Sequence, residues 1–132
     1  MIGLDTNILL RLVLKDDPVQ TELAVGLVAG LSKENPGYVN CITLLEFTWY
    51  LRRRLKLERR LVADTVFSLL QAEDLVFEDE ELIGAVLMRM SDTSVEFADT
   101  IIALRNKRDG CSTTRTFDTA AARQLPEMEL LQ

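Results

Sequence analysis

The chain contains no histidine, and only two cysteines, three prolines and six glycines among its 132 residues. Without histidine there is no Ser-His-Asp or Cys-His catalytic machinery and no imidazole ligand for a metal ion. Two cysteines alone cannot complete a zinc site. Any catalysis must therefore depend on carboxylates, on lysine or arginine, or on a metal ion held by oxygen ligands.

Long apolar runs are also missing. No uncharged apolar stretch approaches the roughly 18 residues that a membrane-spanning helix needs. The N-terminus lacks the basic segment that begins a secretory signal. We therefore expect a cytoplasmic protein without a membrane partner. The length and the 48% hydrophobic content predict a single domain, residues 1–132, built around one core.

The net charge of −6 is unevenly distributed along the chain. Residues 73–81 hold six acids and no base, and we expect this run to form a solvated edge. Residues 52–60 hold six bases and one acid, which fits either an RNA-binding patch or a solvated helix face. The overall acidity therefore does not exclude local attraction to nucleic acid.

Short apolar strands alternate with amphipathic helices. Strands are predicted at residues 1–5, 38–42, 75–77, 111–117 and 128–131, and helices at 6–15, 18–32, 43–55, 57–71, 80–90, 95–108 and 119–124. This alternation favours an α/β fold with a parallel sheet covered by helices on both faces. In such folds the ligand lies beyond the carboxyl ends of the strands.

Four carboxylates have apolar neighbours in the sequence, and we call them the acidic quartet: Asp5, Glu46, Asp99 and Asp118. Taken singly, Asp5 and Asp118 fit helix N-caps, and Glu46 fits a capping box with Thr43. Taken together, four carboxylates repel one another unless a divalent cation such as Mg²⁺ or Mn²⁺ joins them. The quartet therefore predicts metal-assisted hydrolysis of a phosphodiester bond.

Four segments resemble PIN-domain ribonucleases of the VapC toxin type. They are MIGLDTNILLR with KDDP at residues 1–18, LLEFTWYL at 44–51, FADTIIA at 97–103 and TFD at 116–118. The resemblance implies a PIN-like three-layer α/β/α sandwich with a five-stranded parallel sheet in the order 3-2-1-4-5. It also implies that Asp5, Glu46, Asp99 and Asp118 hold Mg²⁺ or Mn²⁺ and carry the catalysis of a cytoplasmic endoribonuclease.

The same resemblance implies supporting residues and partners. Asn7 and Thr116 correspond to polar residues that support the metal site. Glu96 is either structural, in a capping box with Thr93, or an additional metal ligand. The expected partners are RNA, a VapB-type antitoxin and a second copy in a homodimer. The sequence leaves open the RNA target and whether one or two metals bind. Candidate RNA-binding residues are Arg11, Arg52, Arg53, Arg105 and Arg115.

Two other functions remain open. One is a non-catalytic PIN scaffold that binds RNA or protein. The other is an aspartyl-phosphate phosphotransfer or phosphatase domain, which fits less well. The segment Asp5-Thr6-Asn7 lacks the second Asp of an Asp-x-Asp pattern, and no lysine follows Lys107.

The cysteines and aromatic residues carry further expectations. Cys41 and Cys111 are predicted on the second and fourth strands. In the family's order these strands are about 9–10 Å apart, which exceeds disulfide reach. We therefore expect two free thiols in the core. Phe47, Trp49 and Tyr50 are expected to pack in the core or at a dimer contact rather than to stack on RNA bases.

Overall fold

The structure is a computed structural model that describes all 132 residues. Helices and short parallel strands alternate along most of the chain, so the predicted α/β class is confirmed. No helix is both long and apolar enough to cross a bilayer. The elements in chain order are β1 (Ile2–Gly3), α1 (Thr6–Leu14), α2 (Pro18–Ala29), β2 (Gly37–Val39), α3 (Cys41–Trp49), the π-helical turn η1 (Tyr50–Arg54), α4 (Arg59–Leu70), β3 (Leu75–Phe77), α5 (Glu80–Asp92), α6 (Phe97–Arg108), β4 (Thr114–Thr116), α7 (Thr119–Gln124) and β5 (Met128–Leu130).

The first three strands form one parallel sheet in the order β1-β2-β3. Gly37, at the start of β2, lies opposite Ile2 of β1 and Leu75 of β3. A Cβ atom at Gly37 would lie 2.8 Å from Leu4 Cδ1 and 3.0 Å from Leu31 Cδ1. The absence of a side chain at this position therefore allows the strands and the segment that follows α2 to pack closely.

The main core lies between this sheet and its surrounding helices. Leu9 of α1, Val39 of β2, Phe47 of α3, Val66 of α4 and Val86 of α5 are each 0% exposed. Burying one such side chain stabilises the fold by about 1.5–3 kcal/mol. Because these residues come from five different elements and the core extends from Leu4 to Ile101, it joins the chain as far as α6 into one packed body.

The last two strands, β4 and β5, form a separate parallel sheet. The predicted five-stranded sheet in the order 3-2-1-4-5 is therefore wrong for the isolated chain, which contains only the 3-2-1 part. We call β4, α7 and β5 the C-terminal unit. Its packing explains the difference, because a second buried cluster holds the unit on the side of α6. The members of that cluster are Val95, Ala103, Ala121, Leu125 and Met128.

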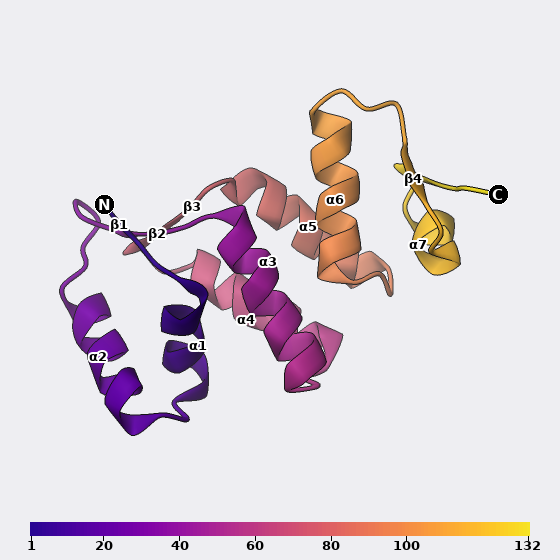
Figure 1. The fold of residues 1–132 in the computed structure, drawn as a ribbon. Helices are drawn as coiled ribbons and strands as arrows, with labels where there is room; N and C mark the ends of the chain where they lie inside the picture. The colour runs from indigo at the N-terminus through magenta and orange to yellow at the C-terminus, as the bar shows by residue number, and fades with distance from the viewer.

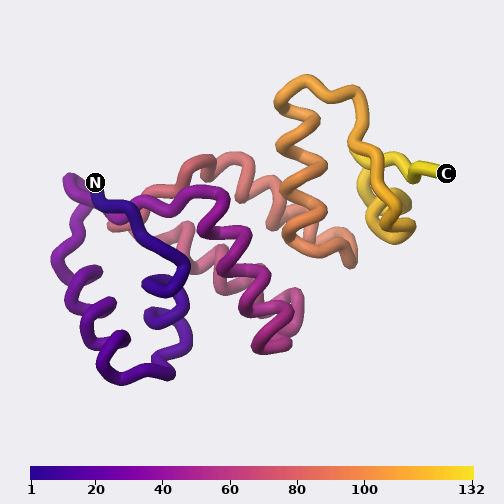
Figure 2. Tube along the Cα trace, viewed as in Figure 1, coloured from indigo at the N-terminus to yellow at the C-terminus, as the bar shows by residue number.

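The molecule is elongated. In Figure 1 the sheet of β1, β2 and β3 lies at one end, the C-terminal unit lies at the other, and α6 stands between them. The trace in Figure 2 shows the two termini at these opposite ends. The first and fourth strands therefore do not meet within one chain.

The cysteines are both free, as predicted, but neither lies on a strand, and the predicted core position is wrong for Cys111. Cys41 begins α3 and is buried, whereas Cys111 lies in the exposed loop between α6 and β4. The strands predicted around them are shorter than expected, because polar residues end β2 and begin β4. Among the aromatic residues, Phe47 packs in the core as predicted, but Trp49 is 54% exposed.

Candidate active site

Asp5 and Asp118 both cap the helix that follows a strand. Asp5 Oδ1 accepts a hydrogen bond from the Thr6 N–H at 2.8 Å, and Asp118 Oδ1 accepts from the Ala121 N–H at 2.9 Å. The predicted N-cap roles are therefore confirmed. In each cap only Oδ1 accepts from the backbone, so Oδ2 of both exposed carboxylates is available to a cation.

The two predicted supporting residues differ in their contacts. Thr116 is half-buried, and its Oγ1 accepts a hydrogen bond from the Asp118 N–H at 3.0 Å. This bond fixes the backbone immediately before α7 and so orients the Asp118 carboxylate. Asn7 is exposed on the first turn of α1, and its side chain remains free to contact a ligand or water.

Asp99 lies on the first turn of α6 and is half-buried. Burial raises the pKa of the Asp99 carboxyl, and the negative charges of Asp118 and Glu96 raise it further, whereas Arg53 lowers it. Asp99 and Asp118 are therefore close enough to repel each other. A pair of carboxylates in this condition gains stability when a cation binds between them.

Glu46 lies on an exposed face of α3. The predicted capping box with Thr43 is wrong, because α3 begins at Cys41. Its N-cap is Asn40, whose Oδ1 accepts from the Thr43 N–H at 2.8 Å. The chain enters the helix directly after β2, which places Glu46 in the middle of α3. Its carboxylate is therefore not needed for capping.

The complete acidic quartet is not assembled within one chain. The charges that act on Asp99 come from Asp118, Glu96 and Arg53, and neither Asp5 nor Glu46 is among them. No group of three acidic or cysteine side chains lies close enough to hold a metal ion. A single chain thus brings two of the four predicted ligands together and leaves the other two apart from them.

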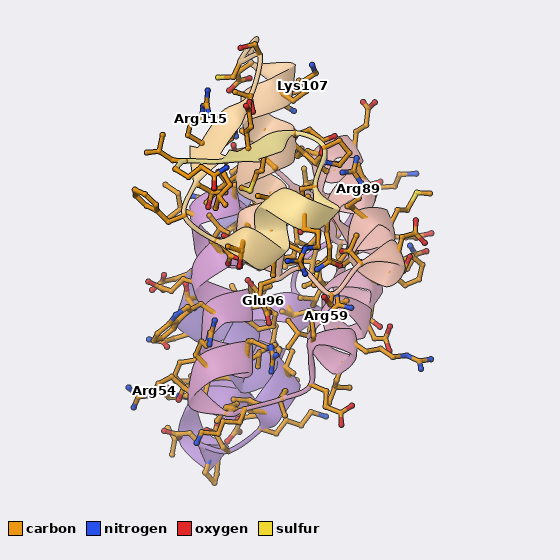
Figure 3. The ribbon with its side chains drawn as sticks, turned by 90° about the vertical axis from the view of Figure 1, so that its right-hand side faces the viewer. Arg54, Arg59, Arg89, Glu96, Lys107 and Arg115 are labelled. Atoms are coloured by element: carbon orange, nitrogen blue, oxygen red, sulfur yellow. The ribbon has the colours of Figure 1, made fainter.

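A cleft of about 190 Å³ lies between the end of α3, η1 and the start of α6. Asp99 and Trp49 line it, together with Arg52 and Arg53 of η1. Arg52 donates to both carboxylate oxygens of Glu96 at 3.0–3.2 Å. Glu96 makes no capping bond, so the capping box predicted with Thr93 is wrong, and Glu96 acts as an ion-pair partner. Figure 3 shows Glu96 and Arg59 in this central region.

Most of the predicted RNA-binding arginines are already paired with acids. Arg11 pairs with Asp16, Arg52 with Glu96, Arg105 with Glu78 and Asp109, and Arg115 with Glu129. Arg53 differs, because it is exposed, lines the cleft and forms no ion pair. Arg54 is also exposed, and Figure 3 shows it pointing away from the body of the molecule.

The acidic run at residues 73–81 is not simply a solvated edge, and this prediction is wrong for two of its members. Glu78 accepts a hydrogen bond from the Cys41 N–H at 3.1 Å and pairs with Arg105. Asp79 caps α5 and contacts Arg108. These acids fasten the C-terminal end of α6 to the sheet. The position of Glu78, directly after β3, was the available sequence signal.

The fold and these carboxylates define an α/β protein whose acids lie at the carboxyl ends of parallel strands and at the starts of helices. The chain matches the PIN domain over residues 2–125 and belongs to the PIN-domain family, which is a nuclease-type superfamily. In a comparison with curated proteins, none matched the chain.

Proposed function

We propose that the chain is a metal-dependent endoribonuclease that cleaves RNA phosphodiester bonds and acts as the toxin of a VapBC-type pair. The observation that carries the proposal is the pair formed by Asp99 and Asp118, since burial and mutual repulsion raise the pKa of Asp99. Membership of a nuclease-type family supports it. The proposed protein works in the cytoplasm, forms a homodimer and is inhibited by a VapB-type antitoxin.

The proposed metal ligands are Asp5, Glu46, Asp99 and Asp118. Their carboxylate oxygens suit hard divalent cations such as Mg²⁺ or Mn²⁺. The Oδ2 atoms of Asp5 and Asp118 accept no capping bond and are available for this role. Asp99 is also suited to it, because burial and neighbouring negative charges disfavour its ionised form, and a bound cation would offset both. When bound, such a cation supplies a Lewis acid and lowers the pKa of a water molecule.

The remaining residues of the site position the substrate and the acids. Arg53 has no carboxylate partner, so its guanidinium is available for an RNA phosphate beside Asp99. Arg52 holds Glu96 and thereby fixes the first turn of α6, on which Asp99 lies. Thr116 orients Asp118 through the backbone N–H. Exposed Trp49 lies in the same cleft and offers a surface for an RNA base.

A cleavage assay tests the proposal directly. Purified protein is incubated with a panel of structured RNAs, including tRNAs and ribosomal RNA loops, with Mn²⁺ or Mg²⁺ and with EDTA. We expect cleavage that requires the metal and is lost in Asp99→Asn. Asp64→Asn, a change to an exposed acid on α4, is the matched control and should remain active. Folded, metal-loaded protein that leaves the whole panel intact contradicts the proposal.

A non-catalytic PIN scaffold is the second candidate. The observation that favours it is the separation of Asp5 and Glu46 from the Asp99 and Asp118 pair in the single chain. A scaffold would bind RNA in a gel-shift experiment, with or without Mn²⁺, and would leave it intact. Coexpression with the protein encoded by the neighbouring upstream reading frame tests the toxin role. Growth arrest that this protein relieves is the expected result.

A further inference from the structure

The first strand has an open edge. The Ile2 N–H donates to the Pro36 carbonyl at 2.9 Å and the Leu4 N–H donates to the Tyr38 carbonyl at 2.8 Å. Successive residues of a strand in a parallel ladder direct their backbone groups to opposite sides. The N–H and C=O groups of Gly3 therefore face the side of β1 on which the chain supplies no neighbouring strand.

The fourth strand has an open edge of the same kind. The Thr114 N–H donates to the Glu127 carbonyl at 2.9 Å, and the Leu131 N–H donates to the Thr116 carbonyl at 2.8 Å. These bonds use the side of β4 that faces β5. The backbone groups of Arg115 face the opposite side, where no strand is present. Each chain thus carries two strand edges that lack partners.

The two open strands match in register. Asp5 follows the last residue of β1 by two positions, and Asp118 follows the last residue of β4 by two positions. Both acids keep an extended backbone, with φ −84° and ψ 163° at Asp5 and φ −79° and ψ 106° at Asp118. Parallel pairing of Gly3 with Thr116 would place Asp5 beside Asp118, with strands about 4.8 Å apart.

Contacts within the chain prevent its own β4 from reaching its own β1. Arg89 of α5 donates to both carboxylate oxygens of Glu127 at 2.6 and 3.0 Å. The Ser94 N–H donates to Gln124 Oε1 at 2.8 Å, and Gln124 Nε2 donates to Ser94 Oγ at 2.8 Å. Closing the sheet within one chain would break these bonds and the second core. Pairing with another chain leaves them intact.

We propose that two copies of this chain form a closed dimer in which β1 of each copy pairs, in parallel, with β4 of the other copy. Reciprocal pairing uses both open edges of both chains, as a two-fold dimer requires. It also covers the side chain of Phe117, which is 79% exposed between Thr116 and Asp118.

The dimer also completes the acidic site. Asp5 at the end of β1 in one copy lies beside Asp118 at the end of β4 in the other copy. Each site then draws its acids from both chains, which a single chain does not achieve. The strand pairing stands on backbone geometry alone, whereas the statement that the shared site is catalytic rests on the function proposed above.

Engineered cysteines test the strand pairing. Gly3→Cys and Thr116→Cys are combined with Cys111→Ser, which removes the exposed native thiol. A side chain at Gly3 meets nothing within 4 Å. Facing residues of neighbouring strands lie about 4.8 Å apart, which is within disulfide reach. On oxidation we expect a covalent dimer on a non-reducing gel. Gly3→Cys combined with Glu129→Cys on β5 is the control and should not cross-link.

A disulfide formed within one chain, or a monomeric mass by light scattering, would overturn the dimer.

A second experiment tests the shared site. Asp5→Asn and Asp118→Asn proteins are unfolded, mixed in equal amounts and refolded together. Mixed dimers with shared sites contain one intact site and one site with both changes. Random pairing then restores about a quarter of the wild-type activity.

If each site lies within one chain, every site in the mixed dimer carries a defect and no activity returns. Absence of recovery with an active wild-type protein therefore overturns the shared site. Another outcome is that the wild-type protein is inactive while the Gly3→Cys, Thr116→Cys variant still cross-links into the dimer. That result contradicts the proposed nuclease function and supports the strand pairing.

Discussion

Arg52 donates hydrogen bonds from Nε and Nη2 to the Glu96 carboxylate, although the two residues are 44 positions apart in the sequence. Both oxygens of Glu96 accept from this guanidinium. The pair joins η1 to the first turn of α6, where Asp99 lies. Glu96 therefore contributes to the site by position and charge, and its oxygens are already occupied by Arg52.

Replacement of Glu96 tests this role. Because Arg52 already binds both Glu96 oxygens, we expect Glu96→Gln to change the affinity for Mn²⁺ by about twofold or less. The loss of a partly exposed ion pair should lower stability by less than about 1 kcal/mol. Asp99→Asn should weaken Mn²⁺ binding at least about tenfold. Titration calorimetry measures the Mn²⁺ affinity of both variants. Equal losses of Mn²⁺ affinity in Glu96→Gln and Asp99→Asn would identify Glu96 as a ligand.

The Asp99 carboxyl should oppose folding in the absence of metal. Its pKa is raised in the folded protein, so the charged form is disfavoured there and stability increases as the pH falls through that pKa. We expect Asp99→Asn to raise the melting temperature at pH 7 by about 2 °C or more without metal. The difference should vanish below about pH 3, where the carboxyl is protonated in both the folded and the unfolded state. A lower melting temperature at pH 7 would contradict this, and Asp64→Asn is the control.

Arg53 and Arg54 are adjacent and both exposed, but only Arg53 lines the cleft beside Asp99. We expect Arg53→Ala to reduce kcat/KM for RNA cleavage by about tenfold, which is typical of losing one charged hydrogen bond. Arg54→Ala should have an effect of about twofold or less. The salt dependence of RNA binding checks the same contact. Equal effects of the two changes would indicate nonspecific attraction.

Glu127 should support stability only while it is ionised. The hydrogen bonds from Arg89 lower the pKa of the Glu127 carboxyl. Its contribution is therefore present above the unfolded pKa, near about 4.3, and is lost as the pH falls through the folded pKa. We expect Glu127→Gln to cost about 1–2 kcal/mol at pH 7 and nothing at the lowest pH at which the protein still folds.

Urea unfolding at several pH values measures this loss. Glu129→Gln is the matched control, because Glu129 lies two residues further along the chain, in β5, and its side chain, which pairs with Arg115, is 59% exposed. Its effect should be small at every pH. A cost for Glu127→Gln that does not change with pH would show that the charge of Glu127 is not the cause.

Two glycines should respond in opposite ways to alanine. At Gly37, Cβ would approach three leucine side chains at 2.8–3.1 Å, so we expect a loss of about 1–3 kcal/mol. At Gly84, inside α5, Cβ meets nothing within 4 Å, and we expect a gain of about 0.5–1 kcal/mol from helix propensity. Thermal unfolding checks both, and a stabilised Gly37→Ala protein would show that the leucines move aside easily.

Local structure could be predicted where the signal is local. Pro18 after Asp17 marked the start of α2, and Asp118 before Thr119 marked the start of α7. Each depends on one side chain that accepts from a backbone N–H close in sequence. The capping box at Thr43 predicted the wrong start for α3, because Asn40 offers an equally good cap slightly earlier. Neighbouring residues alone do not decide between two competent caps.

The arrangement of the site could be predicted only in part. The sequence shows that Asp5, Asp99 and Asp118 have apolar neighbours. Asp5 and Asp118 cap helices, as each taken singly predicts, and the raised pKa of Asp99 reflects its unusual surroundings. It does not show that Arg52 is neutralised by Glu96 while Arg53 stays free. Ion pairing depends on which helices approach each other, and residues of one basic run then have different partners.

The sequence by itself determined the alternation of strands and helices, the parallel sheets, the absence of histidine chemistry and the carboxylates at the strand ends. These properties depend on the periodicity of apolar residues and on side-chain chemistry. Only the tertiary structure decided that β4 pairs with β5 and lies beyond α6, away from β1. The physical reason is the packing of Ala103, Leu125 and Met128 in a second core, together with the Arg89–Glu127 bridge, because burial between distant segments overrides any local preference for where a strand will pair.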